Sequence, residues 1–205
     1  MAVPIGVFSL RNTHTHLPSV KKYGGILYAP RKEIHMDMNQ EDVKRVEEVE
    51  ARIGYVFRNK YLPLQALTRK AFANENEGAE HNELPEHFGD TVLELAIKRE
   101  LLRKYADYDK KRRLVSNMNE GQFSSMEDAY VNNAHLAACI DKLGLVPYIR
   151  FGKGEEKQNC AEQNKAKSNL FEAIVFVVWV DCEENMDTVT QVVLQMLGLS
   201  DQNDI

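Results

Sequence analysis

Apolar residues recur at spacings of three and four along most of the chain beyond residue 40, which is the pattern of helices with one buried face. The clearest stripe follows Asn39, a residue type that favours the N-cap position of a helix. This stripe consists of Val43, Val46, Val49 and Ile53. The same spacing predicts further helices over residues 61–74, 87–105, 120–144 and 186–198, the last two ending at Gly144 and Gly198. We therefore expect an all-α fold.

The most apolar stretch, AIVFVVWV at residues 173–180, fits a buried strand as well as a buried helix. The uninterrupted segment from Lys167 through Val180 is longer than most strands, which favours a helix only weakly. The charged, glycine-containing stretch before it predicts a loop over residues 151–169. No apolar run approaches the roughly 18 residues that cross a bilayer, so we expect no membrane insertion.

Length and composition indicate one main soluble domain. The 205 residues are 43% apolar and 28% charged, enough to bury a core without disulfides or structural metals. The three cysteines are widely spaced, which suggests free thiols in an intracellular, cytoplasmic or mitochondrial, compartment. We expect an extension over residues 1–40, the main domain over 41–200 and a tail over 201–205. Residues 1–32 carry five cations and no acid. This composition fits either a transit segment or a loosely packed arm.

Three acids share one face at the start of a predicted helix. Glu83, Glu86 and Asp90 lie within roughly 60° of one another on a helix that we expect to begin at Asn82. Acids in a first turn gain from the helix dipole, so a solvated surface is the simplest explanation. Gly89, however, sits among them at a cost of about 1 kcal/mol relative to alanine. A glycine there indicates that something approaches the backbone closely.

A second polar pair precedes the apolar run. Asn169 and Glu172 are three residues apart, and a carboxylate at the edge of such a run is partly desolvated and needs a counter-charge. If the two segments face each other, they form a nest of hard oxygen ligands suited to magnesium or manganese. Carboxylates with such an ion are suited to phosphodiester cleavage.

The two segments together resemble a known family. HNELPEHFGDTVLELAI, at residues 81–97, is similar to the ribonuclease III signature, whose usual form is close to HNERLEFLGDAVL. KSNLFEAIVFVVWVD, at residues 167–181, resembles its partner segment, usually K-x-D-x-F-E-A followed by an apolar run and an Asp. Further pieces match in order over roughly residues 45–198. The resemblance also implies that the apolar run is a buried helix.

This resemblance implies a helical endonuclease domain that dimerises around a valley for double-stranded or structured RNA, which it cleaves with Mg²⁺, or with Mn²⁺ in its place. It does not extend to the C-terminal double-stranded-RNA-binding domain common in the family. The dimer is expected with a second copy or with a related chain. The family's metal-site positions fall on Glu86, Asp90, Asn169 and Glu172, and its supporting acids fall on Glu83 and Glu120.

One position departs from the family's usual catalytic set, because Asn169 stands where an Asp is usual. An amide keeps a ligating oxygen but removes one negative charge beside a divalent ion. That charge is worth up to about 4 kcal/mol at 4 Å and an effective dielectric of about 20. Two functions remain open: an endoribonuclease, slow or manganese-preferring, and a catalytically impaired RNA-binding or ribosome-associated structural subunit.

Contacts with RNA phosphates must come from local basic patches, because the chain has a net charge of −5. Two segments supply candidates, although a solvated face is the alternative for both. The candidate residues are Lys110, Lys111, Arg112, Arg113, Lys153, Lys165 and Lys167. If they bind RNA, added salt weakens the complex steeply.

Overall fold

The computed structural model describes residues 21–23, 26–28 and 38–199 of the chain. The chain divides into two units, residues 1–37 and 38–205. The first contains a two-stranded antiparallel pair, β1 (Lys21–Tyr23) and β2 (Ile26–Tyr28), in which Tyr23 pairs with Ile26. The transit-segment and tail predictions fall largely on residues outside the described ones.

The second unit begins with the predicted amphipathic helix, α1 (Gln40–Ile53). Asn39 caps it, since its side-chain oxygen accepts a hydrogen bond from the Asp42 amide at 2.8 Å. Gly54 ends it in the left-handed conformation at φ +71°. The stripe faces the core, except that Val43 keeps 39% of its surface exposed. Two short helices follow, α2 (Tyr61–Ala66) and α3 (Lys70–Glu75).

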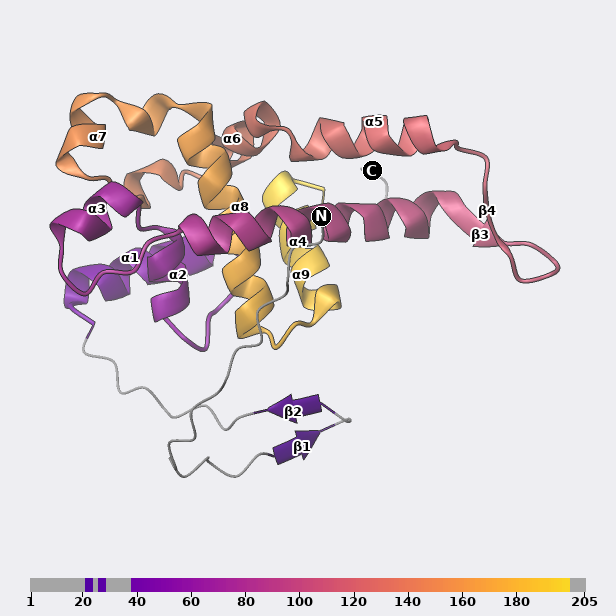
Figure 1. Ribbon diagram of the computed structural model, residues 1–205, viewed down its shortest axis with the longest axis horizontal. Helices are drawn as coiled ribbons and strands as arrows, with labels where there is room; N and C mark the ends of the chain where they lie inside the picture. Colours follow the sequence, from indigo (N-terminus) through magenta and orange to yellow (C-terminus); the bar gives the residue numbers. More distant parts are fainter. Residues whose placement is uncertain (1–20, 24–25, 29–37, 200–205) are drawn as a thin grey trace, which may run out of the picture. The chain divides into compact units, whose positions relative to one another are not determined.

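The centre of the unit is helix α8 (Asn164–Asp181), which packs against α4 (Glu83–Tyr105), α6 (Asn133–Lys142), α2 and α9 (Met186–Leu197) (Figure 1). Every residue from Ala166 to Val175 is buried, so neighbours cover all faces of this part of the helix. A helix in this position must be apolar all round, which explains why the run had no helical period. The all-α fold and the buried helix are confirmed. Within the described residues, no helix has the length and apolarity to span a membrane.

Three of the predicted segments differ from the structure. Residues 61–74, predicted as one helix, belong to two, α2 and α3, because Arg69 between them is extended. Residues 120–144 form two helices, α5 (Glu120–Val131) and α6, because Asn132 is extended and its side chain caps α6 by accepting from the His135 amide. The loop predicted over 151–169 is also wrong. It contains α7 (Lys153–Lys157) and the 3₁₀ turn η2 (Cys160–Glu162), and α8 already begins at Asn164. A further 3₁₀ turn, η1 (Val146–Tyr148), lies between α6 and α7.

A small hairpin connects α4 to α5 and was not predicted. Strands β3 (Ala106–Tyr108) and β4 (Leu114–Ser116) pair antiparallel, with Asp107 opposite Val115. The second half of α4 and α5 run side by side toward this hairpin, which projects at their far end (Figure 1). Its side chains are almost entirely exposed, so no buried stripe marks it in the sequence.

Candidate active site

Helices α4 and α8 meet at Gly89. A β-carbon on this residue would stand 1.9 Å from the backbone carbonyl oxygen of Glu172, so only glycine fits the contact. The close approach predicted for Gly89 is therefore present, and the approaching group is the backbone of α8. This contact sets the distance between the two polar segments.

Four predicted side chains are brought together at this crossing. Glu86 and Asp90 come from α4, and Asn169 and Glu172 come from α8. The Asn169 side-chain amide donates a hydrogen bond to Glu86 Oε2 at 2.6 Å. Asn169 and Glu172 are each only 7% exposed, whereas Asp90 is open to solvent. The two segments, about eighty residues apart in sequence, thus form one acidic cluster.

The cluster alters the protonation of Glu172. The pKa of this carboxyl is raised from 4.5 to about 7. Burial is the main cause, the charge of Lys165 opposes it, and the negative charges of Asp90 and Glu86 add to the rise. Glu172 therefore exchanges its proton near neutral pH. A cation brought into the cluster would favour the ionised form.

Lys165 supplies a positive charge within the chain itself. Its Nζ lies 3.6 Å from Glu86 Oε1, and its charge lowers the pKa of Glu172. Lys165 is one of the predicted RNA-binding residues, and its place beside the acids was not predicted. Its spacing of four and seven residues from Asn169 and Glu172 placed it on the same helical face. That signal was hidden because we expected a loop at residue 165.

The donor atoms suit a hard divalent cation. Asn169 Oδ1 is buried and has no hydrogen-bond partner among the described residues, and the other candidate donors are carboxylate oxygens. Oxygen ligands of this type are preferred by Mg²⁺ and Mn²⁺. Within the part of the chain that the structure describes, no three His, Cys, Asp or Glu side chains are already grouped to hold a metal ion. The residues fit such a cation chemically, and binding it would require the carboxylates to draw together.

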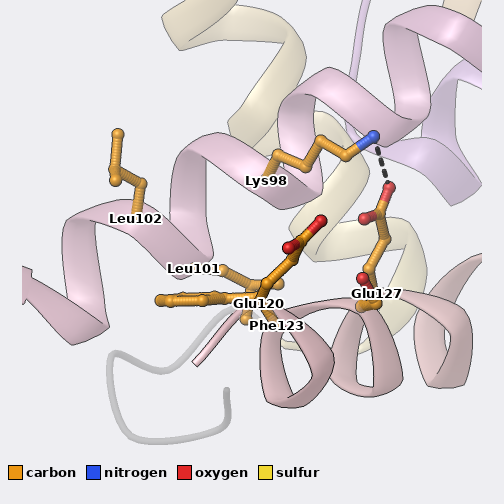
Figure 2. A pocket seen from close by; sticks show the side chains of 7 residues that line it. Lys98, Leu101, Leu102, Glu120, Phe123 and Glu127 are labelled. Atoms are coloured by element: carbon orange, nitrogen blue, oxygen red, sulfur yellow. Dashed lines mark ion pairs between the residues drawn. The ribbon is translucent and has the colours of Figure 1, made fainter. Parts of the chain in front are cut away.

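The two acids predicted to support the site have different surroundings in the structure. Glu83 is exposed and pairs with Lys70 at 2.9 Å, which lowers the pKa of its carboxyl. Glu120 opens α5 and lines a pocket of about 460 Å³ between α5 and the second half of α4 (Figure 2). In that pocket Lys98 forms an ion pair with Glu127 at 2.8 Å. Lys98 lies eight residues beyond Asp90, about 12 Å along the helix axis.

The basic candidates are in different environments. The four residues Lys110, Lys111, Arg112 and Arg113 are exposed at the turn of the β3–β4 hairpin, and Lys153 is exposed at the start of α7. Lys167 is only 6% exposed and its ammonium group pairs with Asp141 at 2.8 Å. Lys167 therefore does not belong to an exposed basic surface, because α8 begins earlier than predicted and turns this residue inward.

Comparison with known proteins identifies relatives of this chain. The sequence profile described as ribonuclease-III-like matches residues 59–197. The chain is 30% identical to ribonuclease 3 of Treponema succinifaciens, over 81% of this chain and 44% of that protein. It is 29% identical to ribonuclease 3 of Roseburia hominis, over 77% of this chain and 47% of that protein. The chain thus spans about half the length of these curated relatives.

Solved structures show the same fold. The nuclease domain of ribonuclease III from Campylobacter jejuni superimposes with a TM-score of 0.63 at 26% identity, covering 75% of this chain and 94% of that domain. A second structure of that domain, whose subject is flexibility in a region involved in its dimer formation, gives a TM-score of 0.62. With the matching profile and the crossing of α4 and α8, these similarities show that the chain belongs to the ribonuclease-III-like family.

Proposed function

We propose that this protein is a divalent-cation-dependent endoribonuclease that hydrolyses phosphodiester bonds in double-stranded or structured RNA. The observation that carries the proposal is the convergence of Glu86 and Asp90 from α4 with Asn169 and Glu172 from α8. Repulsion among these acids costs folding free energy, which a purely structural helix crossing has no need to retain. Family membership supports the same activity.

The carboxylates of Glu86, Asp90 and Glu172 and the free oxygen of Asn169 would hold Mg²⁺, or Mn²⁺ in its place. When bound, such a cation supplies a nucleophilic water at neutral pH and offsets charge on the phosphodiester oxygens. The Asn169 amide fixes the orientation of Glu86 by its hydrogen bond. Without a cation, burial and the neighbouring acids raise the pKa of Glu172 to about 7, and a bound cation would favour the carboxylate form that holds it.

Glu83 and Glu120 are proposed as supporting acids that act through water. Glu83 lies one helical turn before Glu86, so it borders the cluster on the same helix. Within its own chain, Glu120 at the start of α5 lines a pocket with Lys98 and Leu102 of α4, in the half of α4 that lies beyond the cluster. Its supporting role therefore requires a second copy.

A homodimer is proposed because α4 carries an exposed apolar stripe. Its members are Leu84, Phe88, Leu95 and Leu102, each at least 46% exposed. Their spacings of four and seven residues place them within about 40° on the helix. Phe88 also stacks on Phe176 of α8 at 5.7 Å between ring centroids, which widens the apolar face. Large exposed apolar surfaces mark interfaces, and the C. jejuni domain forms dimers.

A catalytically impaired RNA-binding subunit is the second candidate, and one observation favours it. The hydrogen bond from Asn169 to Glu86 and the nearby charge of Lys165 offset part of the acidic repulsion without any cation. A chain that no longer cuts RNA could keep the cluster in this form.

Cleavage of a long duplex RNA in Mg²⁺ and in Mn²⁺ separates the two candidates. The variants are Asn169→Asp and Glu172→Ala, and Glu47→Ala is the control because Glu47 is an exposed acid on α1. Metal-dependent cutting that Glu172→Ala abolishes and Glu47→Ala retains supports the enzyme. If the native chain does not cut and only Asn169→Asp does, the structural subunit is the better description.

A further inference from the structure

The β3–β4 hairpin has a turn closed by one carboxylate. The backbone of Asp109 pairs with Arg113, and the Arg112 amide donates to the Asp109 carbonyl at 2.8 Å. The Asp109 carboxylate accepts from the amides of Lys111 and Arg113 at 2.8 and 2.9 Å. These bonds, together with one from the Arg113 guanidinium, hold the pKa of Asp109 below its usual value. The turn is therefore defined by its own hydrogen bonds.

The four cations of the turn differ in whether a carboxylate pairs with them. Arg113 is tied to Asp109, whereas Lys110, Lys111 and Arg112 have no ion-pair partner among residues 38–199. Arg112 adopts φ +59°, a conformation that glycine tolerates better than arginine.

The positive charge continues to the base of the hairpin. Residues 103–113 contain six cations and two acids, a net charge of +4 in a chain whose net charge is −5. A polar surface pocket of about 500 Å³ lies there, with Arg103, Lys104, Ser116 and Asn117 in its lining. Lys104 lies 5.6 Å from the centroid of the Tyr105 ring.

We propose that the β3–β4 hairpin, with the end of α4, is a contact surface for the phosphate backbone of duplex RNA. The inference rests on the RNA-directed function proposed above and adds a second place of contact. Unpaired lysine and arginine side chains neutralise phosphates and release counterions. Lysines are depleted from the centres of protein interfaces, so Lys110 and Lys111 favour RNA over a protein partner.

The hairpin lies well away from the acidic cluster. Fifteen residues of α4 separate Asp90 from Tyr105, about 22 Å along the helix axis. A contact at this distance changes how tightly and in what orientation duplex RNA is held, and it leaves the chemistry at the cluster unchanged. RNA recognition through the hairpin depends on the shape and charge of the duplex.

Binding of a labelled duplex RNA, measured by anisotropy in EDTA over a range of salt concentrations, tests the proposal. The variant Lys110→Gln/Lys111→Gln/Arg112→Gly removes three charges while Asp109 still closes the turn. The matched control removes three exposed cations elsewhere, as Lys44→Gln/Arg58→Gln/Lys142→Gln. We expect the hairpin variant alone to bind at least about tenfold more weakly, with the salt slope reduced by about 2 to 3.

Acetylation of lysines, followed by mass spectrometry on the native chain, gives a second readout. Duplex RNA should protect Lys110 and Lys111 and leave Lys44 reactive. If the hairpin variant binds duplex RNA with the same affinity and salt slope as the native chain, this inference is wrong and the proposed activity still stands. Absence of any salt-dependent RNA binding by the native chain overturns both.

Discussion

The α-carbon of Gly89 lies directly against the backbone carbonyl of Glu172, so that α4 and α8 touch through their main chains. Any side chain at residue 89 would push the two helices apart, and α8 is the central helix of the unit. The same displacement would separate Glu86 from Asn169. The stability of the fold and the geometry of the acidic cluster thus both depend on the absence of a β-carbon at residue 89.

Gly89→Ala is expected to destabilise the protein by about 3 kcal/mol or more, because backbone cannot rearrange as a side chain can. The urea midpoint measures the loss. Gly154→Ala is the matched control, since Gly154 is also helical, in α7, and a β-carbon there meets nothing within 4 Å. The control should be neutral or stabilising by up to about 1 kcal/mol. Equal midpoints for the two variants would contradict the contact at the helix crossing.

Asn169→Asp is expected to lower the melting temperature in EDTA and to make it respond to Mg²⁺. The change replaces an amide donor 2.6 Å from Glu86 with a second carboxylate, which costs about 1 to 3 kcal/mol without a cation. Added Mg²⁺ then stabilises the variant more than the native chain, because it binds only the folded form. Thermal melts with and without Mg²⁺ measure both effects.

The control for this variant is Asn164→Asp, the same chemical change at the exposed first residue of α8. A carboxylate there gains from the helix dipole, so neither a loss of stability nor a Mg²⁺ response is expected. A melting temperature of Asn169→Asp that is unchanged in EDTA would show that the hydrogen bond to Glu86 does not contribute.

The raised pKa of Glu172 makes the protein less stable as pH rises toward 7. Its carboxyl has an ordinary pKa of 4.5 when unfolded and about 7 in the fold, so between these values the native state binds more protons. The free energy of unfolding therefore falls as pH rises from 4.5 to 7 and is level above that range. After allowance for solvent screening the fall is about 1 to 3 kcal/mol.

Urea unfolding of the native chain and of Glu172→Gln between pH 4.5 and 8 measures this dependence. The amide cannot ionise, so the difference in stability between the two proteins should grow in favour of the variant up to about pH 7. Curves that remain parallel across the range would mean that Glu172 is not desolvated in the cluster.

Periodicity predicted helices well where one face is buried. Val46, Val49 and Ile53 were placed correctly because α1 has a single buried stripe that follows a strong start signal, Asn39. The two-helix division at Asn132 was missed, since α5 and α6 both continue the same spacing across it. The β3–β4 hairpin was missed for a different reason, because strands of three exposed residues leave no alternating pattern.

The candidate site was predictable in its residue types and not in its environment. Spacing placed Glu86 beside Asp90 and Asn169 beside Glu172, but only the resemblance to a family related the two pairs. The position of Lys165 depended on where α8 begins, and the burial of Lys167 depended on its packing against α6. Such contacts between distant segments follow from tertiary packing, which local spacing does not contain.

The apolar stripe of α4 predicts the assembly state. Leu95→Glu places a charge on an exposed residue at the middle of the stripe, so the isolated chain should fold normally while the proposed dimer dissociates. Sedimentation over a range of concentrations should give a dimer for the native chain and a monomer for the variant. Val56→Glu is the control, because Val56 is 72% exposed and lies outside α4. A native monomer at all concentrations would contradict the proposed interface.

Asp181, at the end of α8, anchors the loop between α1 and α2. Its fully buried carboxylate accepts hydrogen bonds from the Tyr55 hydroxyl at 2.9 Å and from the amides of Arg58 and Asn59 at 2.8 and 2.9 Å. Burial and this neighbouring carboxylate raise the pKa of Tyr55 well above its ordinary value. The loop is thereby fixed to the central helix through a single side chain.

Asp181→Ala leaves two backbone donors and a hydroxyl without their acceptor, which should cost about 3 to 5 kcal/mol. Asp181→Asn should cost less, because one amide oxygen still accepts. Urea midpoints rank the variants, with Asp128→Ala, an exposed acid on α5, as the neutral control. Absorbance titration of tyrosine gives an independent check. Asp181→Asn should lower the pKa of Tyr55 by removing the negative charge, and an unaltered titration would show that burial alone sets it.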